Sequence, residues 1–419
     1  MLSAAARSSR SRLILSRFTA RSLSTETVAS ASTDPAPPPP PAKHPAPKTR
    51  SRLSPAPRPA ISHRRQVSPQ LPPTFGQNQL LPVSNTTRAL LESIVADFDA
   101  PIRYAFAYGS GVFEQDGYVP DPKGPMLDFM FAVTYPQHFH SINMNQHPNH
   151  YPLHARMLGS SFVTKVQEIG PGVWFNAFVK TKGVTIKYGV TTVDNLCSDL
   201  LNWNSLYLAG RMHKPLRIIK DEPRVRLTQQ VNLVSAIRAA ILILPESFSE
   251  TQLFETIAGI SYSGDPRMVL PAENRGKVGN IVRKQREQFR ELYYRLVVGL
   301  PGVHWPSWST TIRQDVSPQA RAAHLRKLPS NLLAKIRYQY QREWSIPDNE
   351  MAENATWMKI AGDEKLPLVL HEEMSGIVRY PATIQSLKGI VSGGLITSAR
   401  YSAEKVGKWW RGSKQTPSQ

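Results

Sequence analysis

Two segments of the sequence combine residue types that could hold a nucleotide. An aromatic run, 104–108, ends in Gly109-Ser110-Gly111, and a lone carboxylate, Asp128, stands inside the apolar run 126–133. Glycine lets the backbone approach a phosphate, and backbone N–H groups and a serine hydroxyl can donate to its oxygens. A buried carboxylate needs a cation opposite it, and carboxylate oxygen is a ligand that Mg²⁺ prefers. These residues predict a site in which Mg²⁺ neutralises a triphosphate and orients an in-line attack on it.

Basic residues farther along the chain could contact the same phosphates. Lys187 lies in the apolar segment 183–190, beside Tyr188, and Arg211 and Lys214 follow the segment 196–208. We predict that Asp128 and Lys187 are catalytic and that Asp128 binds the metal. The predicted nucleotide-binding residues are Gly109, Ser110, Gly111, Tyr188, Arg211 and Lys214. Two alternatives stay open: Lys187 protects an edge strand, and Arg211 and Lys214 complement a helix dipole after a C-cap at Gly210.

The elements that must position these residues are strands over 103–108, 126–133 and 183–190 and helices over 80–98 and 196–208. A glycine-serine corner after one strand and an acid on the next is the layout of the nucleotidyltransferase fold. That fold usually carries a second acid two residues later, where this sequence has Met130. Candidates for the missing ligand are Glu114, Asp116 and Asp194. In the alternative interpretation, Asp128 is a buried carboxylate bonded to a loop amide.

A histidine-rich stretch follows the second predicted strand. It contains His138, His140, His147, His150 and His154, with prolines at 136, 148 and 152. The irregular spacing does not match a zinc site, so we expect a solvated loop.

The second half of the chain is predicted to be helical. Segments 231–244 and 277–298 have helical periodicity, and Ser249 and Gln252 form a capping box. Short helices joined by turns predict a helical or winged-helix-like module over 226–345.

The C-terminal segment, 346–419, is predicted to end in an amphipathic helix, whose apolar stripe is interrupted by Gly393-Gly394. Cations and tryptophans surround an apolar stripe, as in helices that lie in a membrane interface. The predicted membrane-binding residues are Lys388, Arg400, Lys405, Lys408, Trp409, Trp410 and Arg411. The alternative is a terminal helix docked on the protein core.

The first 73 residues have the composition of a targeting leader and linker. Residues 1–25 hold five arginines, seven serines and no acid, and 15 of the 36 prolines fall within 34–82. An Arg-rich, Ser-rich, acid-poor start is typical of a mitochondrial presequence, and the proline-rich stretch cannot form a packed core. The alternative is a disordered basic tail.

Composition excludes several classes of protein. The net charge is +20, of which half lies within residues 1–73, so a uniformly basic nucleic-acid coat is not indicated and we expect no nucleic-acid partner. One cysteine, Cys197, excludes internal disulfides and multi-cysteine metal sites. No apolar run reaches 18 residues, so a spanning helix is not expected.

Several motifs together resemble the mitochondrial phosphatidate cytidylyltransferase family, also called the translocator assembly and maintenance proteins. The resemblance covers about residues 75–411 in order. The motifs are YAFAYGSGVF at 104–113, MLDF at 126–129, IKYGV at 186–190, LNWNSLYLAGR at 201–211, SFSE at 247–250, IAGISYSGD at 257–265 and RYPATIQSLKG at 379–389.

The resemblance implies an α+β chain with a nucleotidyltransferase domain at 74–225, the winged-helix-like domain and the membrane-associating segment. It implies synthesis of CDP-diacylglycerol and pyrophosphate from CTP and phosphatidic acid, for cardiolipin, with Mg²⁺ or another divalent cation such as Co²⁺. It places the protein peripherally on anionic lipid at the matrix side of the mitochondrial inner membrane. Two other functions fit the residues: a template-independent RNA nucleotidyltransferase, and a non-catalytic maintenance factor of the import machinery.

Overall fold

The structure is a computed structural model that describes residues 71–109, 111–113, 126–269, 276–347, 351 and 353–412, without the side chains of 269, 390, 391 and 393–412. The chain divides into units 1–64 and 65–419, and all described residues belong to the second. The predicted leader, 1–70 of the 73-residue segment, therefore lies outside the described residues. The domain boundaries at 225 and 345 remain predictions.

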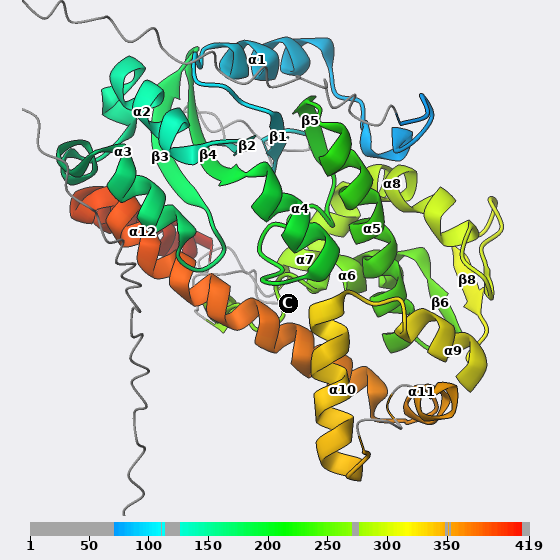
Figure 1. Ribbon diagram of the computed structural model, residues 1–419. Helices are drawn as coiled ribbons and strands as arrows, with labels where there is room; N and C mark the ends of the chain where they lie inside the picture. The colour runs from blue at the N-terminus through cyan, green and yellow to red at the C-terminus, as the bar shows by residue number, and fades with distance from the viewer. Residues whose placement is uncertain are drawn as a thin grey trace, which may run out of the picture. The chain divides into compact units, whose positions relative to one another are not determined.

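We call the described residues up to Ile243 the first block and those after it the second block. A five-stranded mixed sheet forms the centre of the first block (Figure 1). Its order is β3-β4-β2-β1-β5, in which β2 and β4 are parallel and the other neighbours antiparallel. The strands are β1 Tyr104–Tyr108, β2 Leu127–Val133, β3 Trp174–Thr181, β4 Val184–Thr192 and β5 Leu216–Lys220. The three strands predicted from the sequence are confirmed as β1, β2 and β4.

Helices cover both faces of this sheet because side chains along each strand alternate between them. Phe129 and Phe131 of β2 pack in a core with α1 (Asn85–Ala96) and α2 (Pro136–Gln146). Met130 and Ala132 face the other way, into a core shared with α4 (Val193–Asn202) and α5 (Pro223–Ile243). Asp128 belongs to this second face by the same alternation. The remaining elements here are η1 (Gln77–Gln79), η2 (Pro148–His150) and α3 (Leu153–Glu168).

Apolar side chains of the second block pack in the same core as those of α4 and α5. This block contains α6 (Glu250–Gly259), η3 (Pro266–Val269), α7 (Lys277–Lys284), α8 (Arg286–Val298), α9 (Pro318–Leu325), α10 (Ser330–Trp344) and α11 (Asn354–Ala361). A small sheet of order β6-β8-β7 joins Ser247–Ser249, Thr311–Gln314 and Val303–His304. The capping box of Ser249 and Gln252 is confirmed. The helix predicted over 277–298 is two helices, separated at Gln285.

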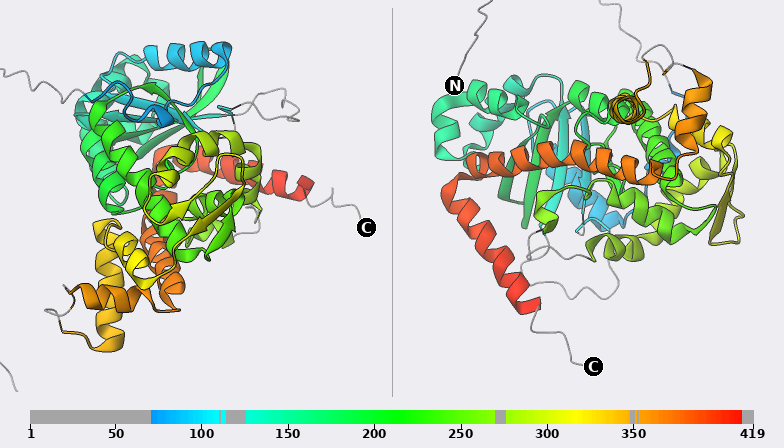
Figure 2. Two further views of the ribbon diagram at one scale, coloured as in Figure 1. Left: turned by 90° about the vertical axis from the view of Figure 1, so that its right-hand side faces the viewer. Right: turned by 90° about the horizontal axis from the view of Figure 1, so that it is seen from below.

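The last helix, α12 (Leu366–Gly412), packs its first half against α5, α10 and β3. Figure 2 shows its red C-terminal part leaving the direction of the orange part. The backbone stays helical through Gly393 and Gly394. Within the described residues, none of the helices combines the length and the apolar character needed to cross a bilayer.

Two other expectations need correction. The histidine stretch is not a solvated loop but forms α2, η2 and the start of α3, with His140 buried between Tyr151 and Gln167. The helix predicted over 196–208 ends at Asn202, where Trp203 adopts φ +54°, so Gly210 is not its C-cap.

A buried carboxylate shapes the loop that follows α4. The Asp199 carboxylate accepts hydrogen bonds from the backbone N–H groups of Ser205, Leu206, Leu208 and Ala209 at 2.7–3.1 Å. These bonds satisfy donors that would otherwise be buried without partners, and they fix the chain just before Arg211.

Asp199→Asn should therefore destabilise the protein, because the amide nitrogen would face backbone donors instead of accepting from them. We expect the free energy of unfolding, measured in urea, to fall by about 2–4 kcal/mol. Asp194→Asn is the matched control, since Asp194 lies on the same helix in an exposed pair with Arg224 and should leave stability nearly unchanged. Equal stability of the two variants would contradict this role of Asp199.

Candidate active site

Three neighbouring strands place their functional side chains in one row. Tyr108 pairs with Asp128 across β1 and β2, and Asp128 pairs with Lys187 across β2 and β4. Residues in register across a sheet point to the same face. The strands thus bring the predicted metal ligand beside the predicted catalytic lysine.

The glycine corner closes over this carboxylate. Gly109 has φ +90°, and a Cβ built on it would lie 3.4 Å from Oδ2 of Asp128. Glycine is the residue that adopts this backbone geometry without strain. Gly111 lies in the turn that follows, whereas Ser110 lies outside the described residues.

Met130 explains why a second acid is missing from β2. Its side chain is fully buried, and its sulfur would lie 2.9 Å from a Cβ on Gly189. The site therefore occupies only the Asp128 end of the strand, and a carboxylate at 130 would be buried in the apolar core.

Arg211 lies on the loop that Asp199 orders, and its side chain extends to the row of Tyr108, Asp128 and Lys187. Its guanidinium stacks on Tyr207 with 4.0 Å to the ring centroid, and Nε donates to the Tyr108 hydroxyl at 3.4 Å. The loop fits tightly against the second block, since a Cβ on Gly210 would lie 2.4 Å from Cβ of Ser261.

The second block contributes further polar groups. Lys214 Nζ donates to Ser261 Oγ at 2.7 Å and to the Gly210 carbonyl at 2.6 Å. Both Lys214 and Lys277 lie near the face of the Tyr262 ring, 5.0 and 5.4 Å from its centroid. Lys214 therefore does not complement the dipole of α4, which ends at Asn202.

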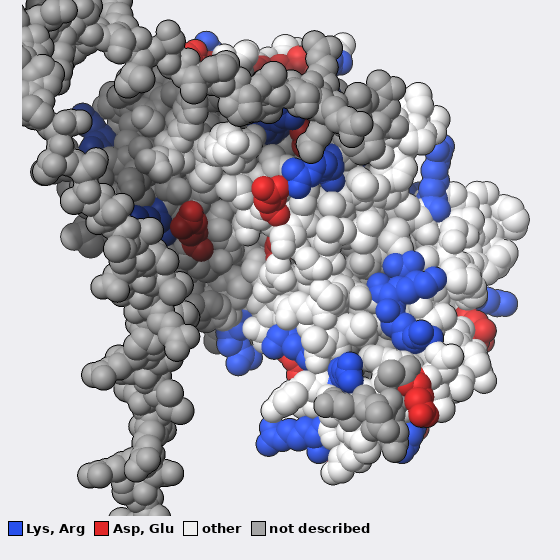
Figure 3. All heavy atoms as spheres, in the orientation of Figure 1, with Lys and Arg blue, Asp and Glu red and all other residues white. Residues whose placement is uncertain are grey.

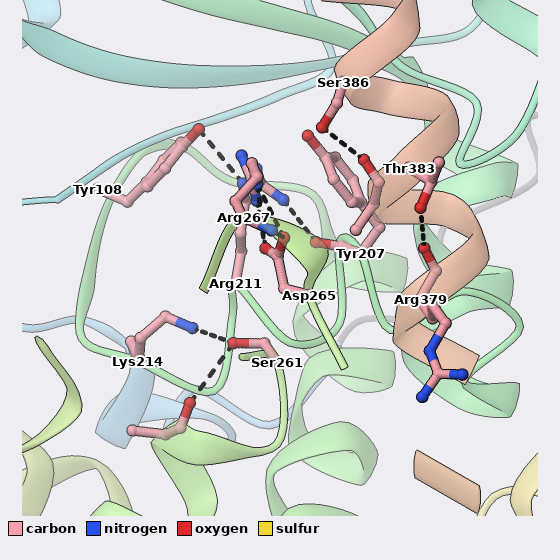
Figure 4. A network of polar contacts seen from close by, with 12 residues as sticks. Tyr108, Tyr207, Arg211, Lys214, Ser261, Asp265, Arg267, Arg379, Thr383 and Ser386 are labelled. Carbon is pink, nitrogen blue, oxygen red and sulfur yellow. Dashed lines mark hydrogen bonds and ion pairs between the residues drawn. The ribbon is translucent and has the colours of Figure 1, made fainter. Parts of the chain in front are cut away.

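An ion pair completes this side of the site (Figure 4). Arg267 donates from Nε to both oxygens of Asp265, at 3.0 and 3.1 Å, and from Nη2 to Oδ2 at 2.6 Å. The figure shows this pair beside Arg211 and Tyr207.

Electrostatics favour the binding of anions at this site. Burial raises the pKa of Asp128, and the charges of Lys187, Arg211 and Lys277 oppose that rise. Burial lowers the pKa of Lys214 to about 7, and the charges of Arg211 and Lys277 act in the same direction. A lysine whose pKa is lowered by burial and by neighbouring cations has room for phosphate charge beside it.

One carboxylate among cations fits Mg²⁺ that arrives with a nucleotide. Magnesium is commonly held by one or two carboxylates together with substrate phosphates and water. The described residues contain no group of three or more histidine, cysteine or acidic side chains arranged as a metal site. Asp194 pairs with Arg224 on the surface, while Glu114 and Asp116 lie outside the described residues.

The structure does not bring Tyr188 into the cluster. Its side chain points to the opposite face of β4 from Lys187, and its hydroxyl contacts Asn143, Asn176 and His150 at 2.8–2.9 Å. The reason is the alternation of the strand, which sends neighbouring residues to opposite faces.

Lys388 is also placed elsewhere than expected. It is 6% exposed, and Nζ donates to the carbonyls of Gln167 and Ile169 at 2.9 and 2.7 Å at the end of α3. Its side chain is therefore used in docking α12 rather than presented at a surface. The other predicted membrane-binding residues, 400–411, have a helical backbone, and their side chains lie outside the described residues.

Sequence reasoning missed the groups from the second block: Ser261, Tyr262, Asp265, Arg267 and Lys277. The sequence places the segment 257–265 only among the motifs of the family resemblance, without a role in the site. The polar side chains gathered in this short turn were a signal for a site. The loop after α4, which they contact, could not be predicted, because the spacing of residues in the sequence does not show which distant segments meet.

Comparison with known proteins identifies the family. A family model described as phosphatidate cytidylyltransferase, mitochondrial, matches residues 91–408. The chain belongs to this family. A protein of that name from Danio rerio is 38% identical over 344 residues, which cover 80% of this chain and 99% of the relative. One from Bos taurus is 40% identical, covering 76% and 94%, and one from Saccharomyces cerevisiae is 40% identical, covering 66% and 74%. The resemblance inferred from the motifs is confirmed.

The lowered pKa of Lys214 predicts that nucleotide binding by this protein depends on pH. Its ammonium is charged below pH 7 and increasingly neutral above it, because its pKa is lowered to about 7. If it contacts phosphate, CTP binding with Mg²⁺ should weaken by about tenfold between about pH 7 and about pH 8.5. In Lys214→Met, binding should be weaker at pH 7 and should change less over this range, as titration calorimetry can measure. The same pH profile in both proteins would contradict the contact.

Proposed function

We propose that this chain transfers the cytidylyl group of CTP to phosphatidic acid, forming CDP-diacylglycerol and pyrophosphate for cardiolipin synthesis. The observation that carries the proposal is the row in which Asp128 lies between the glycine corner and Lys187, with Arg211 and Lys214 nearby. Family membership supports the choice of reaction.

The chemistry requires positioning more than proton transfer. A phosphate oxygen of phosphatidic acid attacks the α-phosphorus of CTP, the bond from that phosphorus to the bridging oxygen breaks, and pyrophosphate leaves. The nucleophile is already an anion, so no strong general base is needed. Orientation of the two anions and neutralisation of charge account for the catalysis.

Mg²⁺ would bind Asp128 and phosphate oxygens, and when bound it supplies charge neutralisation. Lys187, in register with Asp128, would contact phosphate as a compact charge. Gly109 and Gly111, with Ser110, would let the backbone approach the triphosphate. Co²⁺ is a second candidate cation for the same oxygen ligands.

We assign the first block to the nucleotidyltransferase fold and the second to a winged-helix-like module. The glycine corner after β1 and the acid on the antiparallel neighbour β2 support the first assignment. Helices α6, α7 and α8 beside the sheet β6-β8-β7 support the second.

We further propose a peripheral position on the matrix side of the mitochondrial inner membrane. Phosphatidic acid stays in the bilayer through its acyl chains, so the enzyme must approach the surface. The C-terminal half of α12, with Arg400, Lys405, Lys408, Trp409, Trp410 and Arg411, has the residue types of an interfacial helix.

RNA as the acceptor is the less favoured alternative. On the face drawn in Figure 3, the Lys and Arg of the described residues lie in separate groups, some of them beside acidic residues, and form no continuous band. A nucleic acid track requires basic groups that follow the backbone.

Replacing the central acid tests the reaction. Asp128→Asn should lower the rate of CDP-diacylglycerol formation from labelled CTP, Mg²⁺ and phosphatidic acid by about a thousandfold, because metal-bound charge neutralisation is lost. The variant should still unfold in one cooperative thermal transition, with a midpoint somewhat below that of the unchanged enzyme, because Lys187 loses the charge beside it.

Asp194→Asn, in an exposed pair, should keep the rate of the unchanged enzyme. Label that appears in added RNA and in no lipid product would contradict the proposed acceptor. Full turnover by Asp128→Asn would contradict the metal site.

Truncation tests the membrane segment. A chain ending at 392 should lose co-sedimentation with vesicles that contain anionic lipid, while it keeps the part of α12 that packs on the sheet. Lys388→Met should keep vesicle binding and lose thermal stability, because Lys388 bonds α3. Unchanged co-sedimentation of the truncated chain would reject the membrane role of 393–419.

A further inference from the structure

The turn between α6 and α7 is held from two sides. On one side, Lys214 donates to Ser261. On the other, Ser263 lies 3.0 Å from Nε2 of His371 on α12, and a Cβ on Gly264 (φ +74°) would lie 2.3 Å from the Ser375 carbonyl oxygen. The described residues directly after Gly264 are thus held between the loop that carries Arg211 and the helix α12.

Asp265 and Arg267 lie in this fixed turn. The Asp265 side chain is 4% exposed, whereas 44% of the Arg267 side chain remains exposed. Asp265 contacts Nε and Nη2, so the Nη1 atom of the guanidinium is outside the pair. A buried acid that holds one edge of an accessible arginine orients the rest of that arginine toward a second anion.

Arg211 connects this pair to the site around Asp128. Its charge acts on Asp128, on Asp265 and on Arg267. Burial raises the pKa of Asp265, but the hydrogen bonds and charge of Arg267, together with Arg211, bring it below its usual value. With Lys214 protonated, the cluster of Lys187, Arg211, Lys214, Arg267 and Lys277 exceeds its two carboxylates by three positive charges. This excess of positive charge is larger than the negative charge that a triphosphate retains once it has bound Mg²⁺.

We propose that Arg267 binds the phosphate of phosphatidic acid and that Asp265 is the positioning residue that holds it. This inference rests on the proposed function. Arg267 lies on the side of α12, the helix that continues into the proposed membrane segment, whereas Asp128 and Lys187 lie on the sheet. Arg211 lies within electrostatic range of both, where the two substrates would meet. The acceptor phosphate then enters from the α12 side, opposite the triphosphate on the sheet.

Steady-state kinetics of Arg267→Gln with short-chain dihexanoyl phosphatidic acid test the assignment without a membrane. We expect the KM for the lipid to rise about tenfold or more, while the KM for CTP and inhibition by pyrophosphate change less than about twofold. Arg267→Lys should recover part of the lipid KM. Asp265→Asn should raise the lipid KM by a smaller factor and leave the KM for CTP unchanged.

Calorimetric binding of dihexanoyl phosphatidic acid without CTP gives a readout besides activity and should weaken to the same extent. Arg286→Gln is the matched control, because Arg286 pairs with the buried Glu250 in the second block; it should change stability only. An unchanged lipid KM, or an effect confined to CTP and pyrophosphate, would overturn the assignment. Absence of any lipid product with the unchanged enzyme would instead reject the proposed function itself.

Discussion

The structure depends on one partly buried carboxylate held among cations. Asp128 lies in register with Lys187 on a parallel neighbour and beneath a glycine whose backbone only glycine adopts without strain. Neither an acid nor a lysine is stable in such a place alone, because each loses hydration there. Their mutual attraction stabilises both, and a metal-bound triphosphate would neutralise the charge that remains.

The second constraint is that half of the site comes from outside the sheet. The Asp199 carboxylate orders the loop that carries Arg211, and the turn of Ser261 and Arg267 packs between this loop and α12. Contacts between the two blocks therefore position the groups that we propose bind phosphate. In this proposal, cations from both blocks supply the positive charge that two anionic substrates require beside a single carboxylate on β2.

The sequence predicted the strands of the sheet that carry chemistry, because apolar runs and a lone Asp128 are local signals. It predicted the family for a similar reason, since the motifs keep their order along the chain. It failed for Tyr188, because neighbouring residues of a strand point to opposite faces, so Tyr188 cannot line the same site as Lys187. It failed for Lys388 as well, since a docked helix and an interfacial helix share one periodicity. The role proposed for Arg267 depends on contacts of its turn with the loop of Arg211 and with α12. Residue spacing does not predict contacts between segments so far apart in the sequence.

A structure of the protein with Mn²⁺ and a non-hydrolysable CTP analogue would show whether Asp128 holds the metal. We expect anomalous density for manganese within about 2.2 Å of an Asp128 carboxylate oxygen, with the triphosphate beside Gly109 and Lys187. Manganese and nucleotide bound elsewhere on the molecule, with Asp128 still contacting only protein groups, would contradict it.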